Sequence, residues 1–416
     1  MRSPVTSARL SGRRYTRRTF QSLANPEYRR FWFSLIFLMA GINMQMLARG
    51  QLAWELTGDV FLVALVSSGF APPILLFSLF GGTLADRWNR RRMIQYSQLV
   101  VSLVAGIVGV TIVTGVVNIW ILFGAALTQG FCWSFMMPAR QAIIPQLVGE
   151  REITNAIALN ASGMALMTLS GPGLGGLAYS AFGPATTYFV MAALMFVAFV
   201  LMTTVNVEGV PVERRRRENM FSSIWDGLKY SYGNPTIFVL LLLTLATTMT
   251  SQSFRQLMPA QVDLIFGGGP TQLGILMSMI GVGALLGSLF MAGLSENMKR
   301  GVVLLVASGL SAVAILVSTY VTVFLIAIFA MLVLGIGDSG RRALNSGLLL
   351  EQADAEHRGR VMGIYMLNFG LRPIGAIPLG ILAERTSIQL AFAVAGILLA
   401  VSVIATWVFA PFIRRL

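Results

Sequence analysis

The chain has 416 residues, of which 56% are hydrophobic and 12% charged, and its formal net charge is +14. These apolar positions exceed what a soluble fold of this length buries, and at about 20 apolar residues per helix they suffice for roughly a dozen membrane spans. One cysteine and one histidine exclude a disulfide framework, thiolate metal sites and most histidine-based catalysis, so we expect no metal, no cofactor and no enzymatic activity.

Apolar runs bounded by charged or turn residues predict twelve transmembrane helices in an all-α membrane protein. In chain order they cover 31–54, 60–84, 93–115, 118–138, 154–181, 185–205, 237–258, 273–294, 302–319, 321–340, 359–383 and 388–409. A polar stretch with an amphipathic piece at 221–232 separates two sets of six. The predicted organisation is a basic segment (1–28), a six-helix bundle (29–206), a linker with an amphipathic helix (207–235), a second six-helix bundle (236–412) and a short tail (413–416).

Most of the 31 Lys and Arg residues fall in segments that share one side of the membrane if the N-terminus is inside. This asymmetry predicts that both termini are cytoplasmic and that the basic residues lie beside anionic lipid headgroups, with no nucleic-acid role. Arg385 is expected in a short outer loop. Only Arg49, Arg255 and Arg372 then remain within the predicted spans.

The two halves resemble each other in sequence. Arg90 after helix 2 corresponds to Arg300 after helix 8, 210 positions later. At a spacing of 201, Arg140 corresponds to Arg341. We therefore expect a duplicated six-helix unit, with a substrate site between the halves near the membrane midplane.

The segment Gly82-Thr83-Leu84-Ala85-Asp86-Arg87-Trp88-Asn89-Arg90-Arg91-Arg92 resembles the signature between helices 2 and 3 of the major facilitator superfamily. Asn89 stands where that family usually has its second glycine. Charge bias alone would explain the arginines, but not the glycine, leucine and aspartate at these spacings. The resemblance implies a cytoplasmic latch that holds the outward-open state, formed by Gly82, Leu84, Asp86, Arg87, Arg90, Glu296 and Arg300.

The segment Gly171-Pro172-Gly173-Leu174-Gly175-Gly176 resembles the antiporter motif of drug exporters in the same superfamily. The resemblance implies functional roles for Gly171, Pro172, Gly175 and Gly176, although close helix packing would explain them almost as well. The stretches 137–148, 155–156 and 359–363 look like the bacterial branch that contains enterobactin exporters and macrolide efflux proteins. Membership of that branch would place the chain in a bacterial inner membrane as an efflux transporter.

Polar residues within spans are costly and are therefore candidates for function. Those that we assign to a substrate cavity are Gln45, Arg49, Gln129, Gln252, Arg255, Asn368 and Arg372. Three arginines against one intramembrane carboxylate favour an anionic substrate. The alternatives are that Arg49 and Arg255 extend to the outer headgroups, and that Arg372 pairs with Asp338 or with a carbonyl freed by Pro373.

Proton coupling requires a carboxylate that changes its protonation between states, and the candidates are Asp338 and Asp86. Asp338 could instead simply pair with Arg341 or Arg342. The predicted function is proton-coupled export of an amphipathic small molecule by rocker-switch alternating access, by a monomer. The rival hypotheses are a transporter of lipids, lysolipids or organic anions, and a transporter-like membrane receptor that binds without turnover.

Overall fold

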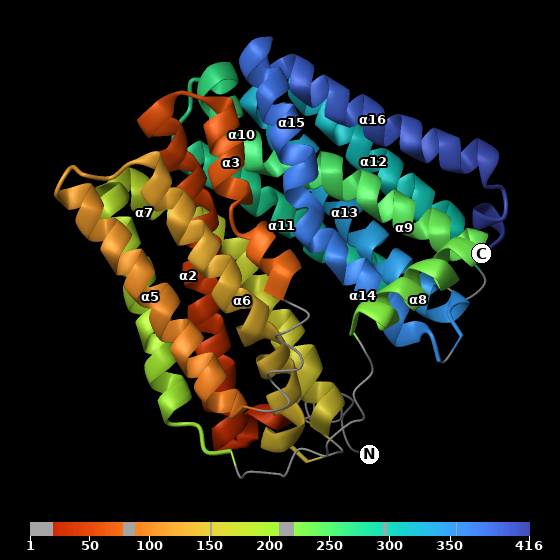
Figure 1. Cartoon of the computed structure of the whole chain (residues 1–416). Helices are drawn as coiled ribbons and strands as arrows, with labels where there is room; N and C mark the ends of the chain where they lie inside the picture. The colour runs from red at the N-terminus through yellow and green to blue at the C-terminus, as the bar shows by residue number, and fades with distance from the viewer. Residues whose placement is uncertain (1–19, 78–87, 150–151, 208–219, 294–297, 355) are drawn as a thin grey trace, which may run out of the picture.

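The computed structural model of the chain describes residues 20–77, 88–149, 152–207, 220–293, 298–354 and 356–416 (Figure 1). All regular structure within these ranges is helical. The side chains at positions 220–224, 292, 369 and 372 lie outside the description.

The principal helices are, in chain order, α2 (Pro26–Thr57), α3 (Val60–Ser68), α5 (Arg90–Val113), α6 (Ile119–Leu147), α7 (Ile153–Thr203), α8 (Met220–Gly233), α9 (Pro235–Thr247), α10 (Ser253–Phe266), α11 (Pro270–Ala292), α12 (Arg300–Tyr320), α13 (Phe324–Gln352), α14 (Arg358–Leu367), α15 (Arg372–Arg385) and α16 (Ile388–Phe409). A π-helical turn, Thr248–Gln252, joins α9 to α10, and a 3₁₀ turn, Asn368–Leu371, joins α14 to α15.

Ten stretches of the described residues are long and apolar enough to cross a membrane. One of them, α7, contains two spans, because Gly183 has a φ of 77° and interrupts the helix. A further span, formed by α14, the 3₁₀ turn and α15, is not one of the ten because the turn interrupts it. The helices therefore agree with the twelve spans predicted from the sequence.

The first helices of the two halves repeat each other in their capping residues and in their length. Asn25 caps α2 and Asn234 caps α9, each accepting hydrogen bonds from backbone N–H groups of the first turn. Pro26–Thr57 and Pro235–Phe266 both have 32 residues, and each is followed by a glycine in the left-handed region. Such glycines end helices because a left-handed residue satisfies the last carbonyls without a Cβ penalty. The structure thus contains the duplicated unit that the sequence predicted.

The helices form two groups, α2 to α7 and α9 to α16, which meet at one end and diverge toward the other (Figure 1). We call the end at which Gly58 and Gly267 follow their helices the closed end, and the end at which α2 begins and α16 ends the terminal end. Contacts between the groups run chiefly through α7 with α11 and through α3 with α15. The described interface therefore lies between the closed end and the middle of the molecule.

Four described side-chain hydrogen bonds join the two halves. Two of them use a carboxylate of the second half: Trp54 Nε1 donates to Asp263 Oδ2 (2.9 Å), and the backbone N–H of Val60 donates to Glu384 Oε2 (3.1 Å). The others join Ser68 to Gln256 (2.7 Å) and Thr271 to Ser180 (2.8 Å). Because Val60 begins α3, Glu384 also satisfies an unpaired donor at the start of that helix.

Candidate functional site

In the first half, three side chains that the sequence had assigned to the cavity form one hydrogen-bonded chain. Arg49 Nη1 donates to Gln129 Oε1 (2.7 Å), and Gln129 Nε2 donates to Gln45 Oε1 (2.8 Å). Arg49 is 4% exposed, so it does not extend into headgroups, and the Nε of its guanidinium is buried without a hydrogen-bond partner among the described residues. Its charge therefore meets a neutral amide rather than a described carboxylate.

In the second half, Arg255 is held by an ion pair. Its Nη2 donates to Asp338 Oδ2 at 2.8 Å, and Asp338 is fully buried. The alternative of an Arg255 that reaches the headgroups is therefore wrong for this structure. The alternative pairing of Asp338 with Arg341 or Arg342 is not the described ion pair, which is with Arg255; Arg342 donates its Nε to the backbone carbonyl of Asp338 (3.3 Å) instead.

The π-helical turn brings two further donors to the same carboxylate. Ser251 Oγ lies 3.0 Å from both oxygens of Asp338, and Gln252 Nε2 lies 3.4 Å from Oδ2. Around this turn Thr244, Thr247 and Thr250 return their hydroxyl groups to backbone carbonyls three or four residues earlier. Such bonds compete with the helical ladder and bend helices, and single π turns are frequent at functional sites.

A pocket between the two halves contains both arginines, and we call it the central pocket. It encloses about 440 Å³ including its mouth. Its lining combines Arg49, Arg255, Gln252 and Gln256 with Met46, Leu47, Gly50, Ser67, Phe70, Pro259 and Met277. Apolar walls with a few converging polar groups are typical of small-molecule sites, and methionine side chains adapt to ligands of different shape.

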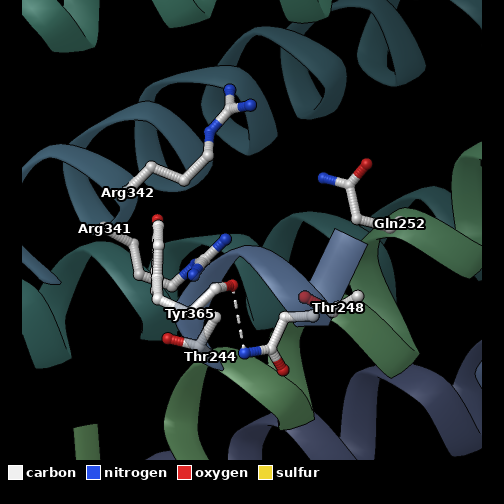
Figure 2. A pocket seen from close by; sticks show the side chains of 7 residues that line it. Thr244, Thr248, Gln252, Arg341, Arg342 and Tyr365 are labelled. Carbon is white, nitrogen blue, oxygen red and sulfur yellow. Dashed lines mark hydrogen bonds between the residues drawn. The ribbon is translucent and has the colours of Figure 1, made fainter. Parts of the chain in front are cut away.

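A second pocket, which we call the lateral pocket, lies within the second half (Figure 2). It has a volume of about 330 Å³ with the open space at its mouth included, and it is lined by Thr244, Thr248, Gln252, Arg341, Arg342, Tyr365 and Asn368. Asn368 is 6% exposed and donates to the backbone carbonyls of Ile364 (3.4 Å) and Tyr365 (3.3 Å), at the break between α14 and α15. Gln252 lines both pockets.

Sequence reasoning missed Arg140 and Arg341, because it ended helices 4 and 10 at positions 138 and 340 and assigned both arginines to charged loops. In the structure α6 continues to Leu147 and α13 to Gln352, and the two arginines are 3% and 2% exposed. The count of three arginines within the spans was therefore too low. Two prolines inside α6, at 138 and 145, gave a false signal of a helix end.

The glycine-rich motif of α7 packs against both halves. A Cβ on Gly171 would lie 2.5 Å from Asn43 Cβ, and one on Gly175 would lie 3.0 Å from Met44 Cα, both in α2. A Cβ on Gly176 would lie 2.3 Å from the carbonyl oxygen of Pro270 in α11. With Pro172 inside the helix, these glycines allow α7 to approach α2 and α11 closely.

Part of the predicted latch lies outside the described residues, namely Gly82, Leu84, Asp86, Arg87 and Glu296. Two of its arginines are described, and each binds the next span of its own half. Arg90 Nη1 donates to the carbonyl of Ala142 in α6 (3.0 Å), and Arg300 forms an ion pair with Glu351 in α13. The side chain of Arg372 is also outside the described residues.

Two helical bundles related by an internal repeat, meeting around a pocket with buried charges, define the architecture of a secondary membrane transporter. Residues 17–412 match the model of the Transmembrane secretion effector family, and the chain belongs to this family of the major facilitator superfamily. It is a multi-pass protein of the bacterial inner membrane and a transporter rather than an enzyme.

Curated relatives of the chain include transporters of siderophores and drugs. It is 25% identical to the Staphyloferrin A transporter of Staphylococcus aureus over 78% of this chain and 81% of that one. It is 25% identical to the multidrug efflux pump Tap of Mycolicibacterium fortuitum, over 92% and 95% of the two chains. The enterobactin exporter EntS of Salmonella typhimurium is 27% identical over 73% and 72%.

Solved structures of transporters share the fold. A point mutant of the nucleoside transporter NupG matches with a TM-score of 0.77 at 13% identity, and the match covers 92% of this chain and 99% of that one. A bacterial homologue of the human lysosomal transporter Spinster, in an inward-facing and unoccupied conformation, matches with a TM-score of 0.69 at 12% identity, over 93% and 95% of the two chains.

Proposed function

We propose that this chain exports amphipathic small molecules that carry an acid group, and that it works by alternating access. The observation that carries the proposal is Arg49, a buried guanidinium that lines the central pocket and is held by a neutral glutamine. An uncompensated buried charge is costly, and a bound acid would supply the missing counter-ion. Met46, Phe70 and Met277 offer the apolar surface for the remainder of the molecule.

The direction of export is supported by the distribution of charge and by the relatives. Among the described residues, basic residues that flank the spans, such as Arg29, Arg90, Arg300 and Arg414, lie at the terminal end. The positive-inside rule assigns this end to the cytoplasm, beside anionic headgroups, together with both termini and the linker. With that orientation, the joined closed end faces outward, and the conformation is one that receives substrate from inside. The names of the curated relatives, a siderophore exporter and a drug efflux pump among them, favour the same direction.

Protons would be coupled to transport through Asp338. While this carboxylate is ionised it occupies the Arg255 guanidinium, which also lines the central pocket. Protonation of Asp338 would weaken the ion pair and release Arg255 to the acid group of a substrate. The Asp338 carboxylate and the acid group of the substrate would then compete for one arginine, so protonation of Asp338 and binding of the acid would favour each other.

The proposal is tested by uptake into proteoliposomes that contain the purified full-length chain as a monomer. Staphyloferrin A serves as the acid-bearing probe, and enterobactin, a catechol siderophore without a carboxyl group, serves as the comparison. Uptake is measured with the lumen acidic and with the outer buffer acidic, so that exchange for protons and cotransport with them are both detected. We expect staphyloferrin A to accumulate, and Arg49→Gln to reduce the rate about tenfold or more, whereas Arg385→Gln removes an exposed charge at the closed end and leaves it unchanged.

Uptake that persists after the pH gradient is collapsed would remove proton coupling from the proposal. Uptake that Arg49→Gln does not affect would remove the acid-binding role of the central pocket. Binding of the probes without any exchange would favour the receptor hypothesis, and uptake of labelled lysolipid in their place would favour lipid transport.

A further inference from the structure

Arg341 is a buried cation that the fold leaves without full pairing. Its side chain is 2% exposed, and its Nε and Nη1 are buried with no hydrogen-bond partner among the described residues. It lines the lateral pocket, where Figure 2 shows its guanidinium extending from α13 toward the space beside Tyr365. A guanidinium carries five donors in a fixed fork, so unused donors at a pocket wall favour a planar acid group as ligand.

The internal repeat indicates that architecture alone does not require an arginine here. Helices α6 and α13 both have 29 residues, so equal distances from their first residues pair Arg140 with Asn345. The contacts agree with this register: Arg140 Nη2 donates to the carbonyl of Phe31 (3.2 Å), and Asn345 Nδ2 donates to that of Leu240 (3.1 Å). Phe31 and Leu240 each follow the capping asparagine of their helix by six residues.

The sequence match of Arg140 with Arg341 was therefore wrong by one helical turn. In the structural register, Arg341 corresponds to Met136, which is 1% exposed and belongs to the apolar core of the first half. One half thus fills this position with a buried thioether, and the other fills it with a charge that faces a pocket. A charge at a site that the repeat can fill with methionine points to a ligand rather than to packing.

The surroundings of Arg341 are positive. Asp338 is within electrostatic reach of Arg255, Arg341 and Arg342, and its carboxylate is already paired with Arg255. No carboxylate is among the described residues that line the lateral pocket, whereas Arg342, Thr248, Gln252 and Asn368 add polar groups. A buried excess of positive charge is stabilised by a bound anion.

We propose that the lateral pocket is an anion-binding subsite for an acid group of the transported molecule, with Arg341 as its main ligand and Arg342 in support. The identity of the ligand rests on the proposed function, whereas binding of an anion does not. Gln252 borders both pockets, so the two pockets are neighbours. A single molecule that engages Arg49 in one and Arg341 in the other would carry at least two acid groups.

The subsite is tested by isothermal titration of the full-length chain in nanodiscs of phosphatidylcholine. Citrate is the probe, because it is compact and carries several carboxylates, and its uncharged triethyl ester is the matched control. We expect citrate to bind and the ester not to bind. Arg341→Met, which installs the residue that the first half uses, is expected to weaken citrate at least tenfold while thermal unfolding stays close to that of the wild type.

Further variants keep the outcome decisive if Arg341→Met fails to fold. Arg341→Lys retains the charge but not the forked donor geometry of a guanidinium, so it is expected to bind citrate more weakly than the wild type. It is expected to bind citrate more tightly than the double variant that combines Arg341→Met with Arg342→Gln. Unchanged citrate affinity in Arg342→Gln and in Arg341→Lys would overturn the proposal.

The variant Arg49→Gln separates this inference from the proposed function. Because Arg49 lines the central pocket and not the lateral one, we expect the citrate binding that remains in Arg49→Gln to be lost when Arg341→Met is added. If Arg49→Gln removes citrate binding and Arg341→Met does not, the subsite is wrong and the acid-binding central pocket stands. If citrate binds through Arg341 but no acid is transported, the subsite stands and the proposed function fails.

Discussion

At the scale of single residues, the two arginines of the central pocket differ in how their charge is compensated. Arg255 has a fully buried carboxylate as its partner, whereas Arg49 has an amide. Removing one member of a buried ion pair leaves the other charge unpaired, which costs about 3–5 kcal/mol, whereas replacing both members is often neutral. The pair and the single arginine are therefore expected to respond differently to mutation.

For the Arg255 and Asp338 pair, we predict that Arg255→Gln lowers the free energy of unfolding by about 3–5 kcal/mol. The double variant Arg255→Gln with Asp338→Asn is expected to recover most of this loss, because no uncompensated charge remains. Thermal unfolding in one detergent, compared across the two single variants and the double variant, measures the coupling. Additive losses would contradict an energetically coupled pair.

Several features of this site could be predicted from the sequence, and others could not. The cost of polar groups in a membrane identified Gln45, Arg49 and Gln129, which the structure joins in one chain. The partner of Asp338 could not be predicted, because a π turn alters the direction in which Ser251 and Arg255 project, and the threonines around the turn indicate a bend without fixing its position. The polarity of these residues could be read from the sequence, whereas the direction in which each side chain projects from its helix could not.

At the scale of helices, charged residues near a helix end misled the sequence reading. The repeat could be recognised from Arg90 and Arg300, but its register in α6 and α13 required the helix bounds and the carbonyl partners of Arg140 and Asn345. In α6 the arginine also lies 4.4 Å from the centre of the Phe31 ring. A guanidinium that contacts an aromatic ring and a backbone carbonyl stabilises the fold, although the sequence around Arg140 resembles that of a cytoplasmic loop.

For Arg140 we therefore predict a loss of stability rather than of ligand binding. Arg140→Met is expected to lower the free energy of unfolding by about 1–3 kcal/mol, because the Phe31 carbonyl loses a donor and the ring loses its cation. Citrate titration of this variant is expected to match the wild type. A loss of citrate binding with unchanged unfolding would place Arg140 in a ligand site instead.

For the packing of α7 we predict that Gly176→Ala separates the two halves at the closed end, since the added Cβ would meet the Pro270 carbonyl. The matched control is Gly309→Ala in α12, where nothing lies within 4 Å of an added Cβ. Spin labels on cysteines introduced at the exposed positions 88 and 298 report the distance across the terminal end. The native Cys132 does not interfere, because it is buried and labels poorly. We expect Gly176→Ala to shift this distance and the control not to shift it.

At the scale of the whole molecule, the described hydrogen bonds between the halves connect only residues from the closed end to the middle. Opening this end must therefore break the contacts of Asp263 and Glu384 with the first half. An alternating-access cycle needs such contacts to be few and replaceable, so that the free energies of its two states stay close.

The closed end is also joined by very short connections. Gly183 alone separates the two spans of α7, and Gly58 with Asp59 separates α2 from α3. The connection after α5 is exposed, with Val116 58% exposed beside Gly115 at a φ of 72°. With the closed end outside the cell, an epitope inserted at Val116 is expected to be recognised by antibody on intact cells, and recognition only after permeabilisation would reverse the orientation.

In the proposed orientation, with the closed end outward, such short connections limit what can reach the protein from outside the cell. External proteases and antibodies meet only a few residues between spans, so the surface of the cell offers almost no loop for them to bind. A blocking compound supplied from outside would gain entry to the central pocket only while the closed end is open. The fraction of time spent in that state, more than affinity for the pocket, would then limit how well such a compound inhibits export.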